Sequence, residues 1–217
     1  APGGAPLMYL ASRSPQRQAI LEALGIDFKV IPPSYEEQDP PGLTPAELVE
    51  RHSRGKAHSV IPAIEPLDPE RPVLGVDTLV ALGGEVMGKA ATEEEAAACL
   101  RRLSGMTHEV FSGVTLITAD AGEGGASGGD MPALSEQTGH AVTAVRFSPL
   151  SEAEIEAYIV TGEWRERAGA YAIQGCAAAF VEAVRGDYNN VVGLPVSLLV
   201  EMLKNSGLWT PAVWWGP

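Results

Sequence analysis

Basic residues are scarce in this sequence. It contains 15 Lys and Arg against 28 Asp and Glu, and its formal net charge is −13 at pH 7. Proteins that follow a nucleic-acid backbone neutralise phosphates with Lys and Arg, so we expect no nucleic-acid partner. The charge still permits a small anionic substrate, provided that a local group of cations and a divalent metal ion offset it.

Cysteine and long apolar runs are also lacking. The two cysteines, Cys99 and Cys176, are far apart and have no metal-binding spacing. This usage predicts free thiols in a reduced, cytoplasmic protein. No apolar run reaches the ~18 residues that a membrane-spanning helix needs, so no membrane partner is expected. The first expected strand is followed by neither a Walker loop nor a dinucleotide-binding fingerprint.

The pattern of apolar residues predicts a mixed α/β sheet flanked by helices. The 217 residues suffice for one domain, 1–217, in one or two lobes. Strands are expected at 7–11, 28–32, 73–80, 107–118, 142–147 and 176–184, with a short return strand after a Gly83-Gly84 turn. Helices are expected to begin after Ser14, Thr44, Thr92 and Ser151, the last three of which open capping boxes, and a final helix runs through Leu203. The Gly-rich stretch 119–140 is predicted to be a flexible insertion, and the tail 209–217 holds three Trp residues.

One carboxylate interrupts the apolar run Val73–Val80. Asp77 lies inside this expected strand, and Lys89 ends the return strand of the same hairpin. Burying a charge is unfavourable unless something pairs with it. Asp77 is therefore either an acid that hydrogen-bonds a loop backbone or a catalytic carboxylate, and this stretch alone leaves both open.

Cations and polar groups elsewhere suit an anionic ligand. Arg17 lies in the first turn of a helix, where the helix dipole disfavours a cation, so it is either solvated or faces a bound anion. Lys56 shares a helix face with apolar residues, and therefore snorkels or meets an anion. The acidic loop around Glu37 is either solvated or holds a hard cation. Gln174 either reads the edge of a base or is a satisfied core amide.

Several ordered motifs together resemble the Maf family over 7–208. They are Leu10-Ala11-Ser12-x-Ser14-Pro15-x-Arg17, Glu36-Glu37, Lys56-Ala57, Leu74-Gly75-x-Asp77-Thr78, Gly88-Lys89, Leu103-Ser104-Gly105-x-x-His108, Ala168-Gly169-Ala170-Tyr171-x-Ile173-Gln174-Gly175 and Val192-Gly193-Leu194-Pro195. The resemblance implies a two-lobed fold akin to the inosine triphosphatases. It also implies a homodimer and a metal-dependent (Mg²⁺ or Mn²⁺) house-cleaning enzyme that splits a nucleoside triphosphate into the monophosphate and pyrophosphate.

The resemblance also assigns roles. It makes Asp77 the proton acceptor and places Glu37 with Asp77 near the metal, with substrate bound by Ser12, Arg17, Lys56 and Lys89. Thr78 and Gln174 are similar to the branch that acts on dTTP and UTP. Gln16 stands where that branch usually has Arg, at a position associated with base preference, so CTP and modified pyrimidine nucleotides stay open. The alternatives are a pyrophosphatase for 7-methyl-GTP or another modified nucleotide, and a nucleotide-binding regulator of septum formation.

Overall fold

The computed structural model describes residues 8–64, 67–119 and 133–209. In this part of the chain the strands are β1 (Met8–Ala11), β2 (Phe28–Val30), β3 (Val73–Leu82), β4 (Glu85–Met87), β5 (Thr107–Ala119), β6 (Leu134–Phe147) and β7 (Val181–Arg185). The helices are α1 (Pro15–Ala23), α2 (Pro45–Val60), α3 (Glu93–Leu103), α4 (Glu152–Thr161), α5 (Tyr188–Val192) and α6 (Val196–Asn205). Short 3-10 turns occur at η1 (Ile61–Ala63), η2 (Ala168–Ala170) and η3 (Cys176–Phe180). No helix in these ranges is both long and apolar enough to cross a membrane.

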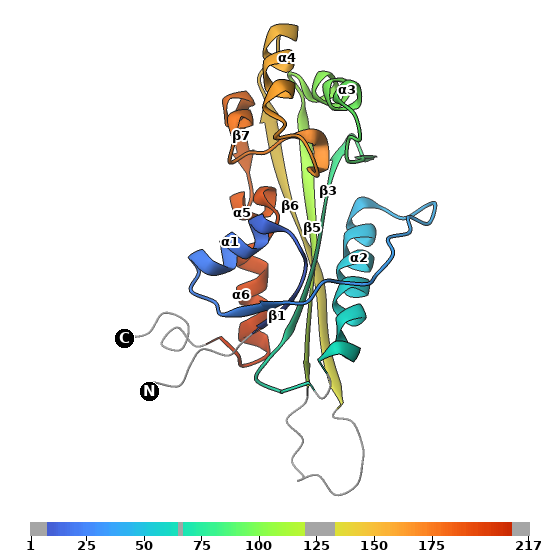
Figure 1. The fold of residues 1–217 in the computed structure, drawn as a ribbon, viewed down its shortest axis with the longest axis vertical. Coiled ribbons are helices and arrows are strands. Elements are labelled where there is room, and N and C mark those ends of the chain that lie inside the picture. Colours follow the sequence, from blue (N-terminus) through green and yellow to red (C-terminus); the bar gives the residue numbers. More distant parts are fainter. Residues whose placement is uncertain (1–7, 65–66, 120–132, 210–217) are drawn as a thin grey trace, which may run out of the picture.

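The sheet is mixed, as the sequence predicts. Its seven strands follow the order β2-β1-β3-β5-β6-β7, and β4 pairs with β3 at one end. β1 is parallel to both β2 and β3, whereas β5, β6 and β7 join by antiparallel pairing. The long strands β3, β5 and β6 run through the whole molecule, so two lobes share one sheet (Figure 1).

Helices cover the sheet differently in the two lobes. In the lower lobe α2 lies on one side of the sheet, and α1 with α6 lies on the other (Figure 1). The α1–α6 side has its own apolar core, which includes Leu21, Leu74 and Leu199, and the α2 side packs around Ala57 and Val73. In the upper lobe α3, α4 and the segment before β7 enclose a third core (Figure 1).

Local sequence explains most helix starts. Thr44 and Ser151 form complete capping boxes with the Glu three residues later. Thr92 caps α3 with its side chain, but Glu95 accepts from the Ala91 amide instead of closing the box. Ser14 is the N-cap residue of α1, but its side chain makes no cap hydrogen bond, and its hydroxyl donates to Gln16. The predicted N-cap position at Ser14 is therefore confirmed, but without a side-chain hydrogen bond to the helix.

Two expected segments differ from the structure. The stretch 176–184 is not one strand: η3 comes first, and only Val181–Arg185 pairs with β6. The expected loop 119–140 is also shorter, because Ala119 and Leu134 form a cross-strand pair and β6 begins there. Residues 120–132 and 210–217, which hold most of the expected insertion and tail, lie outside the described part of the chain.

Candidate active site

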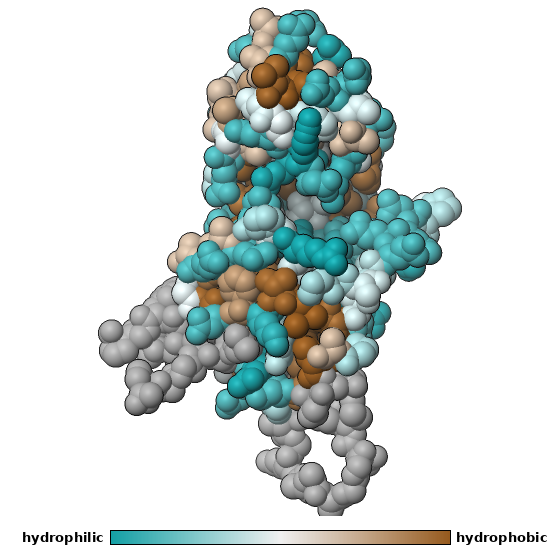
Figure 2. Space-filling view, in the orientation of Figure 1, coloured by the Kyte–Doolittle hydropathy of each residue, from teal (hydrophilic) through white to brown (hydrophobic). Residues whose placement is uncertain are grey.

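A cleft of about 370 Å³ lies where the two lobes meet. The space-filling view shows hydrophilic residues gathered around this waist, with apolar patches above and below it (Figure 2). The lower lobe contributes Gln16, Arg17, Lys56, Asp77 and Thr78 to the lining. The upper lobe contributes Lys89, Glu163, Glu166, Arg167, Tyr171 and Gln174. Seven of the nine residues proposed from the sequence therefore line one cavity.

The alternation of β3 directs two adjacent residues to different helices. Successive strand side chains point to opposite faces of a sheet. Asp77 accordingly meets Lys56 of α2, whereas the Thr78 hydroxyl accepts a hydrogen bond from Arg17 of α1 at 3.1 Å. One dipeptide thus connects the helices on both sides of the sheet to the cleft.

A single lysine joins two carboxylates. The Lys56 ammonium nitrogen Nζ lies 2.5 Å from Asp77 Oδ1 and 2.7 Å from Glu37 Oε1. The side chains of Lys56 and Asp77 are 13% and 11% exposed, whereas that of Glu37 is 48% exposed. Asp77 is therefore a nearly buried carboxylate whose charge is balanced by a lysine, rather than an acid that serves a loop backbone. The catalytic role of Asp77 stays a prediction.

Two glycines allow α2 to bring Lys56 this close. A Cβ atom on Gly75 would overlap the backbone oxygen of Ser53 and the side chain of Ala57. A Cβ on Gly113, which pairs with Asp77 across β3 and β5, would overlap the backbone of Val49. The backbone of α2 therefore rests directly on the strands, as only glycine permits.

Arg17 is a buried cation without a direct carboxylate partner among the described residues. It is 9% exposed. Its Nε donates to the Gly193 carbonyl at 2.9 Å, and its terminal nitrogens donate to Ser12 and Thr78. Burial lowers the pKa of the guanidinium, and the nearby charges of Asp77 and Glu37 oppose this shift. Such a fixed, poorly solvated cation favours an anionic ligand.

The start of α1 adds donors beside Arg17. The first amides of a helix have no carbonyl partner within it, and the helix dipole is positive there. Ser12 is buried and accepts hydrogen bonds from Arg17 and from the Ser14 amide. It therefore supports the turn from behind and does not line the cleft. Gln16 does line it, and its Oε1 accepts from the Ser14 hydroxyl, which leaves the amide Nε2 as a donor.

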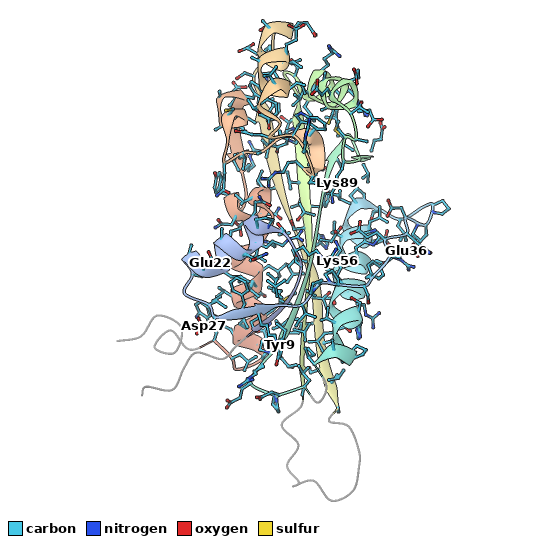
Figure 3. The ribbon with its side chains drawn as sticks, viewed as in Figure 1. Tyr9, Glu22, Asp27, Glu36, Lys56 and Lys89 are labelled. Atoms are coloured by element: carbon cyan, nitrogen blue, oxygen red, sulfur yellow. The ribbon has the colours of Figure 1, made fainter. Side chains whose placement is uncertain are left out.

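Two further cations line the cleft from the upper lobe. Lys89 and Arg167 make no side-chain hydrogen bond or ion pair with any residue that the structure describes. Lys89 follows β4, and Figure 3 shows it on the upper lobe above Lys56. These cations face the paired Lys56 across the waist, and the carboxylates Glu163 and Glu166 line the same side of the cleft.

The wall formed by 163–175 is held by buried side chains from other elements. Tyr158 accepts a hydrogen bond from the Ala172 amide at 3.0 Å, and Cys99 donates to the Gly169 carbonyl. His108 Nε2 lies 2.9 Å from the Tyr171 hydroxyl. Desolvation lowers the pKa of His108 to about 4 and raises the pKa of Cys99 to about 11, so both are neutral at pH 7.

The backbone of this wall is strained. Among the described non-glycine residues, only Glu166 and Ala170 have positive φ, at 58° and 57°. Such conformations are unfavourable for residues with a Cβ and persist where the surroundings impose them, which is often at functional sites. Gln174 is exposed and lines the cleft, so it is not the core amide that the sequence left possible.

Sequence reasoning missed several lining residues. Glu163, Glu166, Arg167 and Tyr171 were not singled out, although the Gly-rich segment that holds them was. Their i, i+3, i+4, i+8 spacing is that of one helix face, but the segment folds into turns and η2 instead, and only this tertiary fold brings them to the cleft. Conversely, Ser12 and Glu37 lie behind or beside the lining, and their expected roles stay predictions.

The site offers a divalent cation two carboxylate ligands, Glu37 and Asp77. No group of three or more His, Cys, Asp or Glu side chains suited to a metal occurs among the described residues. Asp39 of the acidic loop is 2.8 Å from His52 and so does not join Glu37. Two carboxylates, Glu37 and Asp77, nevertheless share one cation between them. Mg²⁺ is commonly held by one or two carboxylates together with substrate phosphates, so these residues fit that mode.

The chain is similar in sequence to several named proteins. The dTTP/UTP pyrophosphatase of Pelotomaculum thermopropionicum is 43% identical over 92% of this chain and 96% of its own. Those of Symbiobacterium thermophilum and Anaeromyxobacter dehalogenans are 44% and 41% identical, over 92% and 95% of this chain and 94% and 97% of theirs. Among solved structures, the Ham1 protein of Staphylococcus aureus covers 65% of this chain and 72% of its own, with 16% identity and a TM-score of 0.40. That likeness is too distant to carry an argument.

The family model described as "Maf-like protein" matches residues 7–206, nearly the whole sequence. With this match and relatives above 40% identity over more than nine-tenths of its length, the chain belongs to the Maf family.

Proposed function

We propose that this protein is a nucleoside triphosphate pyrophosphatase that converts dTTP and UTP to the monophosphate and pyrophosphate. The relatives carry the name dTTP/UTP pyrophosphatase, and the match extends over almost their entire length. The observation that carries the proposal for this chain is the placement of Asp77 in a cleft with four cations, Arg17, Lys56, Lys89 and Arg167. A triphosphate carries several negative charges, which this arrangement offsets although the whole protein is acidic.

Asp77 is the proposed general base. Its carboxylate accepts a proton from a water molecule as the water oxygen attacks the α-phosphorus, and the bond from that phosphorus to the bridging oxygen of pyrophosphate breaks. In the free protein Lys56 orients the Asp77 carboxylate through the 2.5 Å contact. The strand position, pinned between α2 and β5, keeps this carboxylate in place.

The cations bind and orient the triphosphate. Arg17 and the first amides of α1 donate hydrogen bonds from the lower lobe, whereas Lys89 and Arg167 approach from the upper lobe. Donors held in place before the reaction stabilise charge that develops on phosphate oxygens without having to reorganise. A divalent cation held by Glu37 and Asp77 would supply further neutralisation of the phosphate charge.

The base is proposed to contact Gln174, Thr78 and Gln16. Gln174 offers both a donor and an acceptor to the edge of a pyrimidine, next to the ring of Tyr171. The Thr78 hydroxyl is hydrogen-bonded to Arg17 and Ser112. These bonds fix its position, so it would meet the base in one orientation. The free amide of Gln16 is a donor where the related branch usually has a cation.

The test is a nucleotide panel with the purified protein. We would measure pyrophosphate release from dTTP, UTP, CTP and 7-methyl-GTP at neutral pH with Mg²⁺ and with Mn²⁺. We expect dTTP and UTP to give the highest kcat/KM. A clear preference for 7-methyl-GTP would replace the proposed substrate, and nucleotide binding without hydrolysis would favour a regulatory protein.

Asp77→Asn tests the mechanism within the same assay. The amide keeps an oxygen for Lys56 but cannot take the proton, so kcat should fall by at least ~100-fold, the lower range for general-base catalysis. Binding of dTTP and the melting temperature should stay close to those of the wild type. Glu50→Gln, which removes a carboxylate of α2 that pairs with His140 on the surface, is the matched control. Pyrophosphate release by Asp77→Asn at the wild-type rate would remove Asp77 from the mechanism.

A further inference from the structure

The Lys56 ammonium contacts one oxygen of each carboxylate that is proposed to hold the metal ion. Its contacts of 2.5 Å to Asp77 and 2.7 Å to Glu37 place one positive charge between two carboxylates. The sites proposed for the metal and for the lysine are therefore one location. Figure 3 shows Lys56 directed from α2 toward the middle of the molecule, near the loop that carries Glu36.

The two cations cannot bind the same oxygens at once. Mg²⁺ binds oxygen ligands at about 2.0–2.1 Å in a near-octahedral shell and leaves no room for an ammonium on the same oxygens. Like charges at this separation also repel, and the repulsion grows as the surroundings become less polar. Lys56 and Asp77 are both nearly buried, so solvent screens the repulsion between the ammonium and the metal ion only weakly.

Lys56 can leave only if it gains another partner. Its flexible four-carbon stem lets the ammonium turn within the cleft. Without an added anion, no described carboxylate other than Glu37 and Asp77 pairs with it. A triphosphate placed against Arg17 and the start of α1 offers that partner, because its oxygens lie in the same cavity that Lys56 lines.

We propose that Lys56 is a positioning residue that blocks the metal site until a nucleotide arrives. In the free protein it holds Glu37 and Asp77 together and excludes a divalent cation from them. The triphosphate draws the ammonium away, and the two carboxylates then become available to the metal that accompanies the nucleotide. Metal binding therefore depends on nucleotide binding. This inference rests on the proposed function for the identity of the anion, but its central prediction concerns metal binding alone.

The experiment is a titration of the free protein with Mn²⁺, without nucleotide, in which unbound Mn²⁺ is followed by electron paramagnetic resonance. The wild type should bind weakly, with a Kd on the order of millimolar. Lys56→Gln removes the competing charge, and even with water-like screening the affinity should rise by at least ~tenfold. A micromolar Kd for the wild type, which requires no variant to fold, would overturn the proposal.

Three controls assign the effect to the shared contact. Lys56→Arg keeps the charge and should leave the Kd within about twofold. Lys89→Gln removes a cleft cation that touches neither carboxylate, and should likewise change little. The double variant Lys56→Gln/Glu37→Gln loses one ligand and should lose the gain. Thermal melting of each variant checks that it is folded.

The outcomes separate this inference from the proposed function. If a folded Lys56→Gln variant binds Mn²⁺ no more tightly than the wild type, Lys56 does not guard the site, whatever the enzyme hydrolyses. If the affinity rises as expected but no nucleoside triphosphate is cleaved, the proposal that Lys56 blocks the metal site is supported. The proposed substrate class is then wrong.

Discussion

His108 should make the stability of the protein depend on pH. It is 1% exposed, and desolvation lowers its pKa from 6.5 to about 4 in the folded state. The folded protein therefore resists protonation that the unfolded chain accepts. The stabilisation is complete above pH 6.5 and is lost as the pH falls toward 4.

The size of this effect follows from the two pKa values. Between pH 7.5 and pH 5 the shift corresponds to a loss of about 2 kcal/mol in the free energy of unfolding. With a urea m-value of about 2 kcal/mol/M, the unfolding midpoint should fall by ~1 M from this residue. Trp164, 3% exposed in the same apolar core, provides a fluorescence signal.

The assay compares the wild type with His108→Gln at both pH values. Glutamine can place a polar atom near the position of Nε2 and so keep a partner for Tyr171, but it does not titrate. The pH-dependent change in midpoint should be smaller in this variant by ~1 M. His58→Gln, at a partly exposed histidine that pairs with Glu136, is the control and should retain most of the change. An equal pH dependence in the wild type and His108→Gln would refute the reasoning.

Three further predictions concern the cleft. Gly75→Ala should destabilise the protein by ~2 kcal/mol, measured by urea unfolding, because the added methyl meets the α2 backbone at Ser53. Gly88→Ala is the control: a Cβ there meets no atom within 4 Å, so the urea midpoint should change little. Gln16→Ala should alter the ratio of kcat/KM between dTTP and CTP by at least ~fivefold if its amide contacts the base, and an unchanged ratio would exclude that contact. Arg167→Gln should raise KM for dTTP by ~tenfold and weaken the salt dependence of KM, since it removes an unpaired cation from the cleft; an unchanged KM would show that the triphosphate lies elsewhere.

The helices and the central hairpin could be predicted because local chemistry decides them. Capping boxes at Thr44 and Ser151 fix two helix starts, and the apolar run with its Gly-Gly turn fixes β3 and β4. The first residues of β6 could not be predicted as a strand, because the residues from Ser135 to Thr138 are polar. They form a strand only through pairing with β5, a distant constraint that no local pattern contains.

The candidate site could be predicted in part for the same reason. Asp77 and Lys56 stand out because a charge in an apolar setting needs a partner, and the fold brings each to the other. Arg167 and Tyr171 could not be found this way, since their segment folds into turns and η2 with a strained backbone and not into a regular helix or strand. That Lys56 contacts Glu37 also depends on how a loop returns over α2, which spacing along the chain does not specify.

The strands that cross the waist have a mechanical consequence. Because β3, β5 and β6 continue from one lobe into the other, no single flexible joint separates the jaws of the cleft (Figure 1). A movement of one lobe against the other would therefore have to bend or twist these paired strands. The width of the cleft between the lobes is thus tied to the twist of the sheet.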